Sequence, residues 1–276
     1  MNSPFKVLQW NVLDPEFADQ STFPLVKPEC LEWVFRRPLI NKIIDDAAPD
    51  IICLQEVSDN KNFDLLDKRD EFEYIYLPKH STQHGILFGY NKTKFEVVKQ
   101  HAGNFVDEDG SLMSQNFLYI RLLLKCSEKK KQQYISIIVT HLKSKRFFER
   151  RMMQINQMVA FIKERNILEE LLICADMNSE EEEETQKILK DMGLSSVRPG
   201  LFTTLKYPAK YNCKQVKRKI DYIYYNPLAF KLIEDWSLNN EVEHVEGGCP
   251  NHICPSDHLP IIAVFSPKEN DLEPSL

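Results

Sequence analysis

Short apolar runs recur along most of this chain of 276 residues, and several of them end directly in a carboxylate, amide or imidazole side chain. The runs have the alternating or continuous apolar pattern of β-strands, and turn-forming residues separate them. Because a strand end holds a side chain rigidly while the next loop opens it to solvent, the pattern predicts short strands that carry functional side chains. These strands lie at about 5–10, 51–54, 73–77, 85–90, 117–126, 134–140, 171–175, 220–225 and 260–265.

Three segments between these runs have the pattern of helices. Pro38 begins a segment with apolar residues on one helical face, and Pro49 ends it. Ser179 has the character of an N-cap for a helix that runs to about Met192. A third helix is predicted by an apolar stripe with helical spacing. The stripe consists of Phe148, Met152, Ile155, Val159 and Ile162. Strands interspersed with helices predict an α/β protein.

Composition limits the class of protein. The chain is 43% hydrophobic and 28% charged, which is typical of a globular protein, and no apolar run reaches the length of a membrane span or a signal peptide. The seven cysteines are scattered rather than spaced as a disulfide framework, which predicts a reducing compartment, the cytoplasm. The net charge of −6 disfavours tracking along nucleic acid, so local basic residues must bind any anionic substrate.

No repeat, low-complexity block or linker divides the sequence. We therefore expect one catalytic domain over residues 1–267, a flexible tail over 268–276, and a monomer. Lys129-Lys130-Lys131 separates two predicted strands and is predicted to be a hairpin tip.

The polar residues at the strand ends form an oxygen-rich set. Each alone has a structural explanation, such as a turn former or a structural histidine. Together their carboxylates, amides and imidazoles suit Mg²⁺ or Mn²⁺ better than Zn²⁺, which prefers dense Cys/His ligation. The residues are Asn11, Glu56, His141, Asp176, Asn178, Asp221, Asp257 and His258.

A second spacing, Cys-x₂-His-x-Cys, occurs at Cys249, His252 and Cys254. It supplies three soft ligands for zinc, but no fourth ligand is near in the sequence. The role of these three residues is left open.

Six short motifs occur in an order that resembles the endonuclease/exonuclease/phosphatase superfamily. They are Gln9-Trp10-Asn11, Leu54-Gln55-Glu56-Val57, Thr140-His141-Leu142, Asp176-Met177-Asn178, Ile220-Asp221-Tyr222-Ile223 and Ser256-Asp257-His258-Leu259. From about Lys6 to Phe265, the chain is most similar to nocturnin and its relatives among the mRNA deadenylases. The resemblance implies a DNase I-like, four-layer α/β fold, in which a two-sheet β-sandwich is flanked by helices on both outer faces.

The resemblance also implies a role for each residue. Glu56 would be the main ligand of Mg²⁺, or of Mn²⁺ in its place, and Asn11 and Asp257 would lie close to the metal or its bound water. Asp176 would orient and deprotonate the attacking water, and Asn178 would hold the phosphate or the metal from the same strand end.

Two histidines would act on the phosphoryl oxygens. His258, paired with Asp221, would donate a hydrogen bond as negative charge builds, and His141 would donate from another side. None of these residues is an expected nucleophile, so water would attack phosphorus directly.

The implied substrate is a phosphorylated dinucleotide. Lys79, Lys143 and Lys145 match positions that receive the phosphates of NADP(H) in nocturnin-like enzymes, and Asn116 is a further predicted substrate contact. Nocturnin commonly has arginine at the position of Lys145. Lysine keeps the positive charge but lacks the guanidinium group that can form two parallel hydrogen bonds with a phosphate. The implied reaction removes the 2′-phosphate of NADP⁺ or NADPH and leaves NAD⁺ or NADH.

Other activities remain open at this point. A 3′–5′ poly(A) exoribonuclease would use the same catalytic residues, and so would an inositol or sugar phosphatase. The acidic net charge and the few aromatic residues near basic ones in the sequence weigh against RNA. A non-catalytic binding module on this fold would be expected to have lost a metal or base residue, and none is missing.

Overall fold

The computed structural model describes residues 3–58, 69–80, 84–125, 132–144, 147–197 and 200–268. Lys145, the predicted hairpin tip at Lys129–Lys131 and residues 269–276 of the predicted tail lie outside the described residues. Within the described ranges, no helix is long and apolar enough to cross a membrane.

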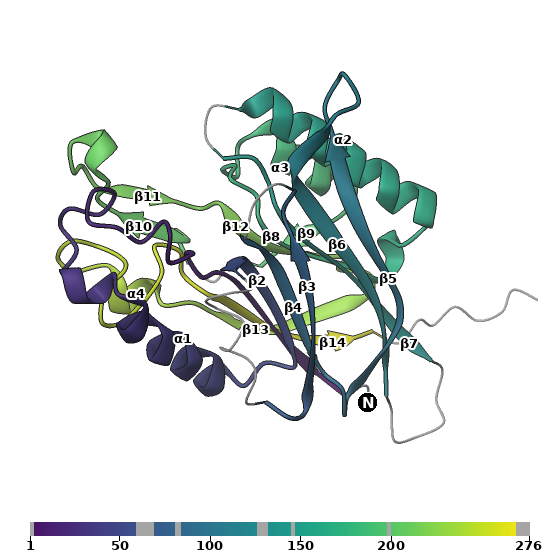
Figure 1. The fold of residues 1–276 in the computed structure, drawn as a ribbon. Coiled ribbons are helices and arrows are strands. Elements are labelled where there is room, and N and C mark those ends of the chain that lie inside the picture. The colour runs from purple at the N-terminus through teal and green to yellow at the C-terminus, as the bar shows by residue number, and fades with distance from the viewer. Residues whose placement is uncertain are drawn as a thin grey trace, which may run out of the picture.

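Two mixed sheets of six strands form the framework (Figure 1). The first has the order β13-β14-β1-β2-β4-β3 and the second the order β5-β6-β7-β8-β12-β9, while β10 and β11 form a separate ribbon. The strands of the first sheet are β1 (Phe5–Asn11), β2 (Ile51–Ser58), β3 (Phe72–Pro78), β4 (His84–Asn91), β13 (Phe230–Trp236) and β14 (Ile261–Pro267). Those of the second are β5 (Phe95–Val106), β6 (Leu112–Leu124), β7 (Gln133–His141), β8 (Leu171–Asp176), β9 (Ser195–Ser196) and β12 (Asp221–Tyr225). The ribbon consists of β10 (Thr204–Lys206) and β11 (Val216–Arg218).

The helices of the described chain lie outside the two sheets (Figure 1). The α-helices are α1 (Trp33–Ala47), α2 (Phe148–Arg165), α3 (Glu184–Asp191) and α4 (Asn239–Val242). The 3-10 turns are η1 (Pro28–Cys30), η3 (Leu168–Glu170) and η4 (Ala209–Tyr211).

Each sheet contains a parallel pair of strands joined by a crossover helix. β1 and β2 are joined through α1, and β7 and β8 through α2. Parallel strands end at the same edge of a sheet. The register pairs Asn11 with Gln55 in the first sheet and His141 with Asp176 in the second, so the predicted site residues lie at matching strand ends.

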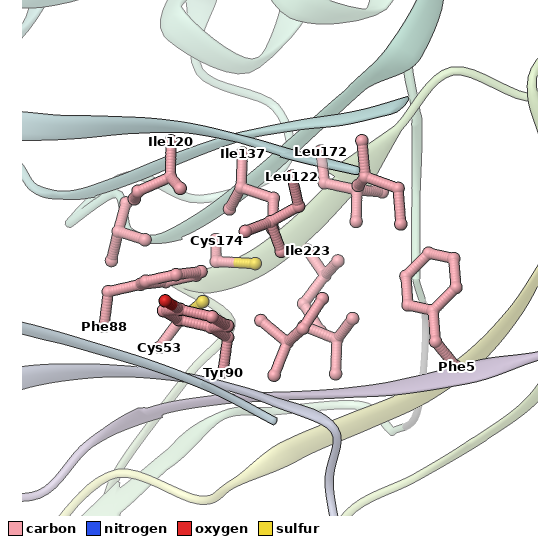
Figure 2. Packing of buried hydrophobic residues seen from close by; sticks show 14 of the residues in the cluster. Phe5, Cys53, Phe88, Tyr90, Ile120, Leu122, Ile137, Leu172, Cys174 and Ile223 are labelled. Carbon is pink, nitrogen blue, oxygen red and sulfur yellow. The ribbon is translucent and has the colours of Figure 1, made fainter. Parts of the chain in front are cut away.

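The core lies in three layers because both faces of each sheet are buried. Alternate residues of β1 face opposite ways: Phe5 and Val7 lie between the sheets, whereas Leu8 and Trp10 pack under α1. Figure 2 shows side chains of the two sheets meeting in the middle layer. The buried stripe of α2 packs on the outer face of the second sheet. This arrangement confirms the predicted four-layer α/β fold.

Two predicted helix starts are wrong. α1 begins at Trp33, so Pro38 lies inside the helix rather than at its first position. Pro38 is exposed, on the face away from the sheet, where its ring disturbs no packing. α3 begins at Glu184 rather than just after Ser179, because the Ser179 side chain bonds the Gln186 amide instead of capping the helix.

The sequence pattern missed the long strands β5 and β13 and the short strands β9, β10 and β11. Most residues of β5 are exposed or partly buried, including Glu96 and Gln100, and β5 and β13 each form an edge of their sheet. An exposed edge strand lacks the apolar run by which buried strands are recognised.

Replacing Ile137 with alanine should lower the free energy of unfolding by about 2–5 kcal/mol, because the lost methyl groups leave a cavity between the sheets. Ile137 is fully buried in the middle layer (Figure 2). The measurement is urea unfolding followed by circular dichroism. The matched control is Ile233→Ala in β13, where the side chain is 52% exposed and the cost should stay below about 1 kcal/mol. Equal costs at the two positions would contradict this account of the core.

Candidate active site

The predicted catalytic residues converge where strand ends of the two sheets meet. Asn11 ends β1 in the first sheet, and Asp176 ends β8 in the second. The Asn11 amide nitrogen lies 3.0 Å from Glu56 Oε1 and 3.1 Å from Asp176 Oδ2, so it donates to a carboxylate from each sheet. The residues that line the shared cavity from the predicted set are Glu56, His141, Asp176, Asn178, Asp257 and His258.

Glu56 occupies a bulge in β2. The pairing register with β4 shifts between Gln55 and Val57, and Glu56 has a φ of +56°. A left-handed conformation is costly for a residue other than glycine, and such strain concentrates at functional sites. Side chains of a strand point alternately to its two faces, and the bulge interrupts this alternation at Glu56. The Glu56 side chain therefore lines the cavity, whereas its neighbours Gln55 and Val57 are buried.

His141 is a neutral imidazole. Its Nδ1 lies 3.0 Å from Lys79 Nζ, and its Nε2 lies 3.4 Å from Asp176 Oδ2. Burial, reinforced by the charge of Lys79, holds the pKa of His141 well below its ordinary value. Burial lowers the pKa of Lys79, and the charges of Glu56 and Asp176 oppose that shift. With Lys79 protonated, the ammonium can only donate, so Nδ1 accepts and the ring proton sits on Nε2. Lys79 thereby selects the tautomer of His141.

His258 is a protonated imidazole. Its Nδ1 lies 2.9 Å from Asp221 Oδ2, and the Thr203 hydroxyl donates to the same carboxylate oxygen at 2.6 Å. Burial alone would lower its pKa, but the carboxylates of Asp221, Asp257 and Asp176 raise the pKa of His258 to about 10. An imidazolium donates from both nitrogens, so His258 can stabilise an anion.

Asp176 exchanges a proton near neutrality. Burial and the negative charge of Asp221 raise the pKa of Asp176 to about 7, while His258 opposes the shift. The backbone N–H of Asn178 donates to Asp176 Oδ1 at 3.0 Å, and the Asn178 amide donates to the Leu142 carbonyl at 3.1 Å. The Asp176 carboxylate is therefore held in one orientation.

Two cations that the sequence did not single out stabilise the site. Lys206 in β10 pairs with Asp257, and although burial alone would raise the pKa of Asp257, Lys206 and His258 hold it below the ordinary value. Arg36 on α1 is fully buried and donates to carbonyl oxygens of two loops, Pro255 at 2.6 Å and Val12 at 2.7 Å. No sequence signal distinguishes it from its neighbour Arg37.

The oxygen donors fit a divalent cation. Each Glu56 carboxylate oxygen accepts one hydrogen bond, which leaves lone pairs for a metal, and the buried Asp257 Oδ1 has no hydrogen-bond partner among the described residues. Asp176, Asp221 and His258 also have ligand atoms within 4.8 Å of one another. Because His258 Nδ1 is bonded to Asp221, we do not assign these three residues to metal binding.

The site opens into a cavity of about 510 Å³. The predicted Lys79 and Lys143 line it. Asn116 does not: it is buried behind the wall, and its amide donates to the Pro78 carbonyl beside Lys79 at 2.6 Å. Lining residues that the sequence analysis missed are Phe17, His84, Lys206, Lys210, Tyr211 and Arg218.

The Cys249, His252 and Cys254 side chains do not converge on one centre. Both cysteines are buried, whereas His252 is exposed. The Cys254 thiol lies 3.3 Å from the Ser256 carbonyl oxygen and 3.4 Å from that of His258. These contacts hold the loop that leads to His258.

Comparisons with known proteins identify the family of the chain. A family model described as "Endonuclease/Exonuclease/phosphatase family" matches residues 8–258. Nocturnin of Mus musculus is 27% identical over 300 residues, which cover 99% of this chain and 68% of that protein. Nocturnin of Homo sapiens is 27% identical over 95% of this chain and 65% of its own length. The chain thus spans about two thirds of the length of these relatives.

Solved structures share the fold. The crystal structure of ANGEL2, described as a 2′,3′-cyclic phosphatase, superposes with a TM-score of 0.82 at 20% identity and covers 96% of both chains. The human nocturnin catalytic domain with bound sulfate gives a TM-score of 0.72 at 24% identity, covering 96% of this chain and 94% of that one.

Replacing Arg36 with methionine should lower the free energy of unfolding by about 3 kcal/mol or more, because buried carbonyl oxygens of two loops lose their donor. Activity should fall too, since one loop follows Asn11 and the other precedes His258. Chemical unfolding and a phosphoesterase assay measure the two effects. The matched control is Arg37→Met, one position along the same helix and only partly buried, which should cost less than about 1 kcal/mol. Similar losses at the two positions would contradict the proposed role of Arg36.

Proposed function

Because the chain belongs to the endonuclease/exonuclease/phosphatase family, whose members are phosphoric ester hydrolases, we propose that it is a Mg²⁺-dependent phosphatase that removes the 2′-phosphate of NADP⁺ or NADPH. The observation that carries the proposal is the group of cationic side chains on the cavity floor, where a terminal phosphate would sit. Lys79 lies 3.0 Å from His141, and the imidazolium of His258 lines the same cavity.

The charge of this floor favours a terminal phosphate. A phosphate monoester carries up to two negative charges near neutral pH, whereas an internal phosphodiester carries one. Lys79, His258 and a divalent cation beside Glu56 together match the more highly charged group. Lys143 lines the cavity near them, with Nζ 5.0 Å from the centre of the Phe147 ring, and is placed to receive a second phosphate of the substrate.

Two segments that are far apart in the sequence line the cavity together. They are the segment that contains Phe17 and Thr22 and the turn η4 between β10 and β11. The Ala209 N–H donates to the Thr22 carbonyl at 3.2 Å and joins the two segments.

Exposed aromatic rings on the cavity wall suit a nucleobase. Phe17 is 40% exposed and Tyr211 is 49% exposed, and both line the cavity. Few aromatic residues lie near basic ones in the sequence, but the fold brings Phe17 and Tyr211 together with Lys143 and Lys210 around one cavity. Stacking on such rings is worth about 1–3 kcal/mol per base. These rings favour a nucleotide over an inositol or sugar phosphate.

The mechanism follows from the protonation states. A bound Mg²⁺, or Mn²⁺, would be held by Glu56 with Asn11 and Asp257 beside it and would neutralise charge on the phosphoryl group. Asp176 takes a proton from the attacking water. His258, kept protonated by Asp221, stabilises the charge on the phosphoryl oxygens. The products are inorganic phosphate and NAD⁺ or NADH.

A 3′–5′ exoribonuclease acting on poly(A) is the second candidate. The same aromatic rings would stack on an adenine at an RNA chain end, and the same catalytic residues would cleave the last phosphodiester. Distinguishing the two candidates requires a direct comparison of substrates.

A screen of phosphate release with Mg²⁺ should show turnover of NADP⁺ or NADPH without shortening of a 5′-labelled oligoadenylate. Inositol phosphates and glycerol 2-phosphate, which lack a base, should react more slowly because they gain nothing from Phe17 and Tyr211. Chelation by EDTA should abolish activity, and added Mg²⁺ should restore it.

The controls of this screen are Glu56→Ala and Asp176→Asn, of which the second should lower kcat by about 10²–10⁴-fold. A ladder of shortened oligoadenylates would favour the exoribonuclease. Full activity of Glu56→Ala on every substrate would show that the metal site is misassigned.

Lys143→Ala should raise KM for NADP⁺ by about 10-fold, the order expected when a charged hydrogen bond is lost. It should change KM for glycerol 2-phosphate much less, because that substrate has no second phosphate to contact Lys143. Steady-state kinetics of phosphate release measure both values. The control is Lys163→Ala, an exposed lysine in the last turn of α2, which should leave both KM values unchanged. An equal rise for both substrates would argue against a role of Lys143 in binding the second phosphate.

A further inference from the structure

The turn that follows β1 is held in a strained form next to Glu56. Leu13 has a φ of +57°, which is costly for a branched residue. Its N–H donates to Asn11 Oδ1 at 3.0 Å, and the fully buried Arg36 donates to the carbonyl oxygens of Val12 and Leu13. These bonds fix the position of the next residue, Asp14.

Asp14 lies against the Glu56 carboxylate. Its N–H donates to Glu56 Oε2 at 3.3 Å, and its Oδ1 accepts the N–H of Glu16 at 2.9 Å. The side chain is buried, with only 1% of the residue exposed. Its other oxygen, Oδ2, is buried and has no hydrogen-bond partner among the described residues.

A buried carboxylate oxygen without a partner is costly, so it indicates a missing ligand or water. The Oδ1 bond to Glu16 completes the turn. The buried Arg36 guanidinium interacts electrostatically with Asp14 but makes no hydrogen bond to Oδ2. Glu56 and Asn11, two residues assigned to the metal site, contact the same turn through Asp14 and Leu13. A divalent cation with its coordinated waters is a ligand that this oxygen can serve.

We propose that Asp14 is a further carboxylate of the metal site, which acts beside Glu56 by accepting a hydrogen bond from metal-coordinated water at Oδ2. The proposal rests on the metal site of the proposed function. Asp14 then increases the affinity for the divalent cation, and its charge adds to that of Glu56 and Asp257.

The variant Asp14→Asn tests this role because it keeps an oxygen for the Glu16 N–H and replaces the charged Oδ2 by a neutral NH₂ group. Titration of the protein with Mn²⁺, with free Mn²⁺ read by electron paramagnetic resonance, should show an affinity about 10-fold or more below that of the unchanged protein. The melting temperature without metal should stay close to that of the unchanged protein, while the rise in melting temperature at a fixed Mn²⁺ concentration should shrink.

The matched control is Asp50→Asn. Asp50 is also a buried carboxylate next to a strand of the first sheet, 8% exposed, but it bonds Lys6 and Lys94, which lie away from the site residues. Its Mn²⁺ affinity should equal that of the unchanged protein.

Glu56→Gln serves as the benchmark. If Glu56→Gln weakens Mn²⁺ binding and Asp14→Asn stays within about twofold of the unchanged protein, the role of Asp14 is overturned, even where activity or stability falls. If Glu56→Gln itself binds Mn²⁺ normally, the metal site of the proposed function fails, and the role of Asp14 fails with it.

Discussion

The Asn11 amide makes the contact on which the site depends, because it donates to Glu56 of one sheet and to Asp176 of the other. It can do so only when the sheets pack with the ends of β1 and β8 facing each other. The middle core layer sets that packing, and bonds around Asn11 fix its orientation: its Oδ1 accepts from Leu13, and its backbone carbonyl accepts from Ser256. The metal side and the proton-transfer side of the site are therefore coupled through one buried side chain.

Buried charges are balanced by partners from distant parts of the chain. Asp257 is neutralised by Lys206, and the carboxylate of Asp221 keeps His258 protonated. Lys79 contacts His141 and selects its neutral form. A cation is costly to bury unless it is paired, and removal of one partner of a buried pair leaves the other charge uncompensated. The charge of Lys79 is offset by Glu56 and Asp176 rather than by the neutral His141. The same reasoning points to a ligand at Asp14, whose buried Oδ2 has no partner among the described residues.

Much of the site was predictable because its residues follow apolar strands directly in the sequence. Asn11, His141 and Asp176 are each the last residue of a strand. An apolar run in the sequence shows where a strand ends, and so shows which polar side chain is held at that end. Arg36 and Lys206 were not predictable, since an arginine on a helix and a lysine on a short ribbon have the same local pattern whether buried or exposed. The predicted start of α1 was wrong because Pro38 was taken as the first helical residue, whereas the helix begins at Trp33 and contains Pro38.

By itself, the sequence determined the α/β class through local periodicity, and its ordered motifs determined the family of phosphoric ester hydrolases and implied the four-layer fold. The strand ends also supplied the oxygen-rich set of candidate catalytic residues. Only the tertiary structure decided which charges pair, which tautomer His141 adopts and which residues surround the substrate cavity. Phe17 and Tyr211 are far apart in the sequence and line the same cavity, and Asn116 lies behind its wall. These residues belong to segments that are far apart in the sequence. The segments come together only when the two sheets pack.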